Sequence, residues 1–165
     1  MTFNFKLSSA RATELLGRAL AQTLPAGSGV ILYLHGELGA GKTTLVRALL
    51  RELGVVGAVK SPTYTLIESY EVAGWNVAHV DLYRLVSQGE VAELALQELL
   101  SERSLLLIEW PERAARLPSP DAALSLLYEG AGREAQLVVH TPLGERWLHQ
   151  LRFDTRLQSY LSNLT

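Results

Sequence analysis

A glycine-rich stretch between a short apolar run and an amphipathic segment carries the clearest chemical signal in the chain. It reads GELGAGKTT and matches the pattern G-x-x-x-x-G-K-[ST]. Its glycines let backbone N–H groups curl around an anion at a helix N-terminus, because no Cβ atoms stand in the way. Lys42 is then placed to neutralise outer phosphates, and the Thr43 hydroxyl is placed to coordinate Mg²⁺. The predicted phosphate-binding residues are Gly36, Leu38, Gly39, Ala40, Gly41, Lys42, Thr43 and Thr44.

Two carboxylates stand where apolar runs end. Glu109 follows SLLLI, and Asp81 follows WNVAHV. In open α/β sheets ligands bind at the carboxyl ends of the strands, and a phosphate-binding loop enzyme places a carboxylate there to hold the Mg²⁺ shell. We therefore expect Thr43, Asp81 and Glu109 to hold the metal, and Lys42, Glu109 and Asp81 to be catalytic. The alternative is that each carboxylate is a solvated charge or a helix N-cap.

Other polar residues give weaker signals. The hydroxyl-rich SPTYT segment (residues 61–65) fits either a switch that senses the γ-phosphate or an ordinary turn into a strand. Trp110 fits a partner anchor and a core position equally well. Arg133, in a predicted turn, either reaches a nucleotide or is solvated. The four histidines lack the spacing of a metal site, so we expect them to be hydrogen-bonded or on the surface.

The pattern of apolar residues predicts the elements that position these groups. Helical spacing covers residues 8–24, 44–53 and 88–100, and a short helix is expected after Asp154. Strands are expected at residues 30–34, 64–70, 75–81 and 104–110. The segments after Pro120, including RWLHQLRF, suggest antiparallel strands joined by tight turns. The fold class is therefore α/β, a P-loop NTPase-like mixed sheet with a parallel centre, flanking helices and C-terminal antiparallel strands, formed by a single domain over residues 1–165.

Composition excludes several classes of protein. The chain has 165 residues, a formal net charge of −2 and no cysteine. Disulfides, thiolate catalysis and cysteine-ligated zinc are therefore excluded. The slightly negative net charge argues against a protein that binds nucleic acid through its own positive electrostatic potential. No apolar run approaches the ~20 residues that span a bilayer, and the N-terminus lacks the pattern of a signal peptide. We expect a cytoplasmic protein that has no contact with membranes.

Five segments together resemble the TsaE family: GELGAGKTT, KSPTYTLIESY, HVDLYRL, LLLIEWPER and EGAGRE. The resemblance implies a small Mg²⁺-dependent ATPase of bacterial tRNA threonylcarbamoyladenosine formation. Such a protein binds and hydrolyses ATP so that a complex of the TsaD and TsaB proteins can turn over, and it is not itself the transferase. That complex modifies adenosine 37 of tRNA, so contact with tRNA would be indirect. The motifs that read guanine in GTPases, D-x-x-G and N-K-x-D, are missing, which favours ATP over GTP.

The resemblance also implies roles for single residues. Lys42 would contact phosphates, Thr43 would bind Mg²⁺, and Glu109 would hold the metal or position water with Asp81 beside it. Arg133 and Thr13 would lie near the nucleotide. One departure is visible in ELALQELL, where Ala95 stands at a position at which the family typically has glycine. The geometry of residues 88–100 is therefore the least secure part of the comparison.

Two other functions fit the same residues. A P-loop kinase would use Asp81 and the hydroxyls of SPTYT as acceptor-site groups. A nucleotide-gated binding protein would need Lys42 but not hydrolysis. Because P-loop sites often lack a transition-state arginine until a partner supplies or orders one, we expect slow ATP hydrolysis by the isolated chain.

Overall fold

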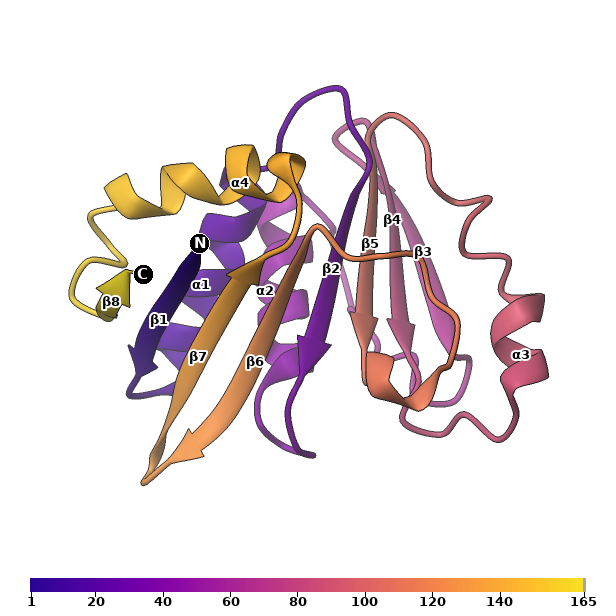
Figure 1. Cartoon of the computed structure of the whole chain (residues 1–165), viewed down its shortest axis with the longest axis horizontal. Helices are drawn as coiled ribbons and strands as arrows, with labels where there is room; N and C mark the ends of the chain where they lie inside the picture. Colours follow the sequence, from indigo (N-terminus) through magenta and orange to yellow (C-terminus); the bar gives the residue numbers. More distant parts are fainter. Residues whose placement is uncertain (165) are drawn as a thin grey trace.

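The computed structural model describes residues 1–164 and contains one eight-stranded mixed sheet (Figure 1). The strands are β1 (Thr2–Leu7), β2 (Val30–His35), β3 (Ile67–Val72), β4 (Trp75–Asp81), β5 (Ser104–Glu109), β6 (Ala122–Glu129), β7 (Gly132–Val139) and β8 (Leu161–Leu164). Their order across the sheet is β3-β4-β5-β2-β6-β7-β1-β8. Strands β4, β5, β2 and β6 are parallel, and antiparallel strands extend both sides. The predicted fold class is confirmed.

Helices flank this sheet on both of its faces. They are α1 (Ala10–Gln22), α2 (Lys42–Leu53), α3 (Gln88–Glu93) and α4 (Pro142–His149), with short 3₁₀ turns η1 (Pro111–Arg113) and η2 (Gln150–Phe153). In Figure 1, α1 and α2 lie together behind the sheet, whereas α3 lies at the far right beyond β3. Helix α1 begins after Ser9, whose hydroxyl accepts a hydrogen bond from the Ala12 N–H at 3.3 Å. This N-cap satisfies one of the free N–H groups at the helix start.

Strand β5 is buried on both faces, and this fixes the position of Glu109 at its end. Leu105 and Leu107 belong to the core under α1 and α2, and Leu106 and Ile108 belong to a second core on the opposite face. Burying one such side chain is worth about 1.5–3 kcal/mol. A slip of one residue would exchange the two faces and carry Glu109 away from its neighbours.

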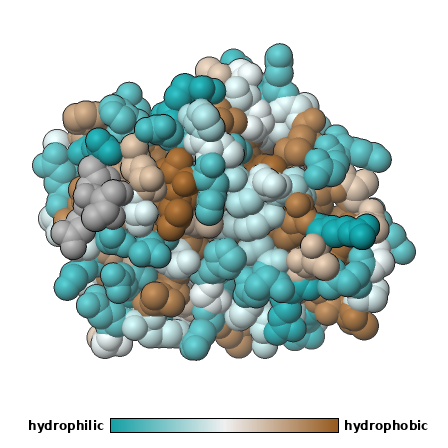
Figure 2. Space-filling model, in the orientation of Figure 1, coloured by the Kyte–Doolittle hydropathy of each residue, from teal (hydrophilic) through white to brown (hydrophobic). Residues whose placement is uncertain are grey.

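The surface shown in Figure 2 is mainly hydrophilic, with hydrophobic side chains in separate patches. Large apolar or aromatic side chains that stand out from the surface include Leu38, Val56, Tyr64 and Val86. Among residues 1–164, no helix has the length and apolar character needed to cross a bilayer.

The helix predicted over residues 88–100 is wrong in its second half. Helix α3 ends at Glu93, and turns follow until β5. The backbone of Ala95 is left-handed, with φ of +46°. A right-handed helix cannot continue through such a residue. The helix therefore ends before Ala95, although the helical spacing of apolar residues in the sequence continues beyond it.

Two further expectations are corrected near the C-terminal end, and one element near the N-terminal end was not predicted. Residues 146–153, predicted as a strand, lie in α4 and η2, because the Thr141 hydroxyl accepts the Gly144 N–H at 3.1 Å and Pro142 starts the helix. The short helix expected after Asp154 is replaced by turns and β8, which pairs with β1. Strand β1 itself was not predicted, although its alternate residues are buried.

The left-handed backbone of Ala95 generates a test of the fold. The left-handed conformation destabilises the folded state by roughly 1–2 kcal/mol for alanine but not for glycine. Glycine in turn loses more conformational entropy on folding, which offsets about 0.5–1 kcal/mol of that difference. We expect Ala95→Gly to raise the free energy of unfolding by about 0.5–1 kcal/mol in urea titrations. Ala92→Gly, in the regular part of α3, is the matched control and should lower it by about the same amount. A loss of stability in Ala95→Gly would contradict the assignment of backbone strain.

Candidate functional site

The loop between β2 and α2 has a shape that requires glycine. Gly36 has φ of +136°, and a Cβ atom there would lie 2.5 Å from the Leu126 carbonyl oxygen. Gly41, with φ of +110°, is the N-cap of α2. The loop therefore turns sharply at both ends and leaves the first N–H groups of α2 facing its concave side, which is the geometry that accepts an anion.

Lys42 begins α2 and folds back into the loop. Its ammonium donates to the Gly36 carbonyl and to the Glu37 carbonyl at 2.9 Å, and it lies 4.0 Å from the centroid of the Trp110 ring. Desolvation lowers the pKa of Lys42, and the nearby charges of Glu109, Asp81 and Glu112 act in the opposite direction. The loop thus holds a cation that has already given up most of its water, which strengthens its attraction for an entering anion.

Glu109 is the buried acceptor at the centre of the site. Its carboxylate accepts the Thr43 hydroxyl at 3.0 and 3.2 Å, and it is 2.8 Å from Nε2 of His79. Both Glu109 and His79 are buried. Because an ionised carboxylate only accepts, Nε2 must carry the imidazole proton, and Nδ1 has no partner within residues 1–164. Two donors from two elements therefore fix the position of Glu109.

Asp81 lies beside Glu109 and collects a second set of hydroxyls. The two residues are directly paired across β4 and β5. One oxygen of Asp81 accepts from Thr63 at 2.9 Å and from Ser61 at 3.4 Å, and the other accepts the Tyr83 N–H at 3.0 Å. The SPTYT segment is therefore hydrogen-bonded to the candidate site and is more than a turn that leads into β3.

These groups surround a cavity of about 420 Å³. Its lining includes Leu38, Gly39, Gly41, Lys42, Thr43, Thr44, Ser61, Thr63, Asp81, Tyr83, Arg84, Glu109 and Trp110. Within residues 1–164, no group of three or more histidine, aspartate or glutamate side chains is arranged to hold a metal ion. The donor set of one hydroxyl and two carboxylates suits Mg²⁺, which keeps several waters and shares phosphate oxygens with its substrate. The residues present therefore fit a nucleotide-bound magnesium ion.

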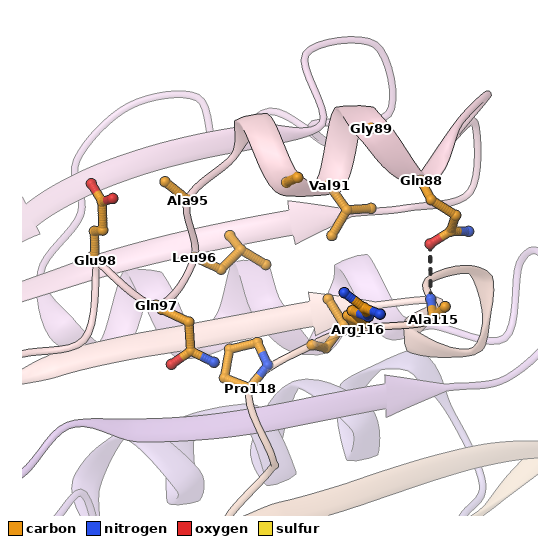
Figure 3. A pocket seen from close by; sticks show the side chains of 12 residues that line it. Gln88, Gly89, Val91, Ala95, Leu96, Gln97, Glu98, Ala115, Arg116 and Pro118 are labelled. Carbon is orange, nitrogen blue, oxygen red and sulfur yellow. Dashed lines mark hydrogen bonds between the residues drawn. The ribbon is translucent and has the colours of Figure 1, made fainter.

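A larger cavity, of about 600 Å³, lies away from this site (Figure 3). It is bordered by α3, the turns after it and residues 115–118, and Val91, Leu96 and Pro118 are among its lining residues. The side-chain oxygen of Gln88 accepts the Ala115 N–H at 2.9 Å across one end, as drawn in Figure 3. This cavity contains no lysine and no pair of carboxylates, so size alone does not mark the candidate site.

Arg133 and Thr13 also reach the loop, from the side of β7 and α1. Arg133 lies in β7, not in a turn, and donates to the carbonyls of Ala40 at 3.1 Å and Gly39 at 3.2 Å. Its guanidinium lies 4.0 Å from the centroid of the Tyr128 ring, whose hydroxyl donates to Leu38 O at 2.9 Å. Thr13 is buried in α1. Thr13 and Arg133 line a cavity of about 160 Å³ that shares Gly39, Gly41 and Thr44 with the first.

Sequence reasoning missed His79 and left the place of Trp110 open. His79 precedes Asp81 on β4 with the spacing that puts both side chains on one face of a strand, and this period of two was the available signal. Trp110 is half-buried, and its backbone is in the left-handed conformation. Its ring lies between the Lys42 ammonium and the ring of Tyr83, and the Trp110 and Tyr83 ring centroids are 5.0 Å apart.

The fold and the loop together define an α/β protein of the phosphate-binding loop class: a parallel centre, a glycine-rich loop between β2 and α2, and carboxylates at neighbouring strand ends. The family model for the threonylcarbamoyl adenosine biosynthesis protein TsaE matches residues 7–136. This chain belongs to the TsaE family.

Individual relatives agree with this assignment. The tRNA threonylcarbamoyladenosine biosynthesis protein TsaE of Haemophilus influenzae is 42% identical over 117 residues, which are 70% of this chain and 74% of that protein. The protein of the same name from Streptomyces coelicolor is 42% identical over 139 residues, 80% of this chain and 91% of that protein. A crystal structure of YdiB from Bacillus subtilis has a TM-score of 0.63 at 22% identity, and the match covers 94% of this chain and 95% of that one. It shows the same fold.

The contact between His79 and Glu109 can be tested by stability. In His79→Leu the buried carboxylate loses a donor, so we expect the free energy of unfolding to fall by about 1–3 kcal/mol in urea titrations. His79→Gln can donate from its amide and should recover part of the loss. His140→Leu is the control, because His140 is exposed and should change stability by less than about 0.5 kcal/mol. Equal losses for the Leu and Gln variants at position 79 would show that shape, not hydrogen bonding, matters there.

Proposed function

We propose that this protein is a Mg²⁺-dependent ATPase that supports the complex forming threonylcarbamoyladenosine in tRNA. The observation that carries the proposal is the meeting of Lys42, Thr43, Asp81 and Glu109 around one cavity at the carboxyl edge of the parallel strands. A cation, a metal-binding hydroxyl and buried carboxylates at a glycine-rich helix start are the groups that nucleotide hydrolysis requires. Membership of the TsaE family, named for this tRNA modification, supports assigning the proposed hydrolysis to that process.

The side chains around the cavity share the tasks of phosphate binding, metal binding and water positioning in this proposal. The N–H groups of the loop and Lys42 bind the phosphates, while Thr43, Glu109 and Asp81 hold the metal ion. Bound Mg²⁺ would neutralise phosphate charge and make the terminal phosphorus easier to attack. Glu109, held by Thr43 and His79, is placed to orient the attacking water. Arg133 and Tyr128 brace the loop through its carbonyls, so the N–H groups stay turned toward the phosphates.

The proposed partner is a complex of the TsaD and TsaB proteins, and tRNA is met through that complex. The charge of the chain supports this indirect role. A formal net charge of −2 provides no general field to attract nucleic acid, so partners would supply most of the tRNA-binding surface. The cavity also holds several exposed or half-exposed groups at its rim, which a docked partner can cover to exclude water.

ATP turnover by the purified protein, alone and with the TsaD–TsaB complex and tRNA, tests the proposal. We expect a slow basal rate that rises at least tenfold with the complex. Glu109→Gln should abolish turnover while it retains ATP binding, and Lys42→Ala should weaken binding, because only the first change leaves the phosphate contacts intact. Glu98→Gln, which lines the other cavity, is the matched control and should behave like the unmodified protein.

Other outcomes would replace this function with a different one. Transfer of labelled phosphate to a small acceptor instead of water would make the protein a kinase. Full support of tRNA modification by Glu109→Gln, with loss in Lys42→Ala, would make it a nucleotide-gated binding protein.

The lowered pKa of Lys42 predicts how ATP affinity changes with pH. Phosphate binds the protonated lysine, and in the free protein burial makes the proton leave at a lower pH than usual. Affinity for ATP should therefore fall as pH rises through this lowered pKa, at a lower pH than for an ordinary lysine, and the bound anion should raise the pKa again. Calorimetric titration between pH 7 and 10 measures the effect. Lys42→Arg should show little of it, because arginine stays protonated in this range; an equal fall in both proteins would contradict the assignment.

A further inference from the structure

The cavity that contains Lys42 has a second cation in its wall, Arg84. Its guanidinium carbon lies 4.3 Å from the centroid of the Tyr64 ring. Within the part of the chain that the structure describes, Arg84 has no ion pair and no side-chain hydrogen bond. Tyr64 is 80% exposed, so its ring adds little to the core. Among the described residues, Arg84 thus places a positive charge without an ion-pair partner at the edge of the candidate site.

The segment that carries Tyr64 is tied to the same site. Its neighbour Thr63 donates to Asp81 at 2.9 Å, and Asp81 in turn accepts the N–H of Tyr83, next to Arg84. The residues that precede Tyr64 and Arg84 in the sequence are therefore both hydrogen-bonded to one carboxylate that lines the cavity. A cation over an exposed aromatic ring is worth about 0.5–1 kcal/mol, which is enough to bias the position of the guanidinium and too little to lock it.

The charges of the cavity show what a free guanidinium could do. Lys42 donates to two loop carbonyls, and two carboxylates lie nearby. A triphosphate brings further negative charge, and positive groups aimed at the phosphoryl in transfer stabilise its transition state. We propose that Arg84 is a catalytic residue that supplies the second protein cation to the transferring phosphoryl group, with Tyr64 as the positioning residue that holds it.

This inference rests on the proposed ATPase function. In the reaction, the oxygen of water bonds to the γ-phosphorus while the bond from that phosphorus to the bridging oxygen breaks. The electron pair of the broken bond stays on ADP, and the protons of water stay on the released phosphate or pass to solvent. Arg84 remains protonated throughout and donates hydrogen bonds to the oxygens that gain charge.

The test compares nucleotide binding with turnover, in the presence of the TsaD–TsaB complex and tRNA. We expect Arg84→Ala to lower kcat roughly 10²- to 10³-fold and to change the Kd for ADP by less than about threefold. Affinity for ADP with aluminium fluoride, which imitates the phosphoryl in transfer, should fall about as much as kcat. Arg84→Lys should recover only part, because a lysine lacks the planar fork. Arg116→Ala, in the other cavity, is the matched control and should change neither quantity.

The positioning role of Tyr64 is tested by measuring kcat in two variants. Tyr64→Phe keeps the ring and should keep kcat, whereas Tyr64→Ala should lower it roughly two- to fivefold, the equivalent of the cation–π contact. The inference is overturned if Arg84→Ala keeps the kcat and aluminium fluoride affinity of the unmodified protein, or if it loses ADP affinity and kcat equally. Weaker binding of the TsaD–TsaB complex without loss of aluminium fluoride affinity would make Arg84 a docking residue instead. Absence of hydrolysis in the unmodified protein would reject the proposed function itself.

Discussion

The arrangement of the site depends on one buried carboxylate and its need for hydrogen-bond partners. Glu109 is 2% exposed at the end of a strand that is covered on both faces. An unpaired charge in such a place costs several kcal/mol, so the fold must bring partners to it. Thr43 comes from the first turn of α2 and His79 from the neighbouring strand β4. The start of α2 and the register of β4 against β5 are therefore both tied to one side chain. The hydroxyl and the carboxylate that a metal would need are hydrogen-bonded to each other.

The glycine loop is supported from two directions by parts of the chain that are distant in sequence. On one side, Arg133 and Tyr128 from the β6–β7 hairpin donate to the loop carbonyls. On the other side, Lys42 donates to the carbonyls of the loop itself. These hydrogen bonds hold five consecutive carbonyls of the loop, from Gly36 to Ala40, and so fix the orientation of its peptide groups. The antiparallel extension of the sheet thus has a structural task at the site, although it contributes no carboxylate to the cavity.

Much of this arrangement was predictable because it depends on local pattern. The glycine motif and the apolar strands before Asp81 and Glu109 are short-range signals, and each lies where the sequence places it. What could not be predicted depends on tertiary contacts or on backbone conformation. The left-handed Ala95 ends α3 without any change in apolar spacing, and the pairing of His79 with Glu109 requires the strand order. Strand β1 and helix α4 are different cases, since their alternation and the Thr141–Pro142 start were readable signals that were missed.

The position of Trp110 has one more consequence. Of the three tryptophans in the chain, Trp147 is fully buried and hydrogen-bonded to the Leu20 carbonyl, while Trp110 lines the cavity with its ring 4.0 Å from the Lys42 ammonium. A charge at this distance shifts the electronic levels of an indole, so the emission of Trp110 follows the charge and position of the lysine. One of the three intrinsic fluorophores of the protein therefore lies in the cavity beside Lys42, and part of the tryptophan emission responds to changes at that place.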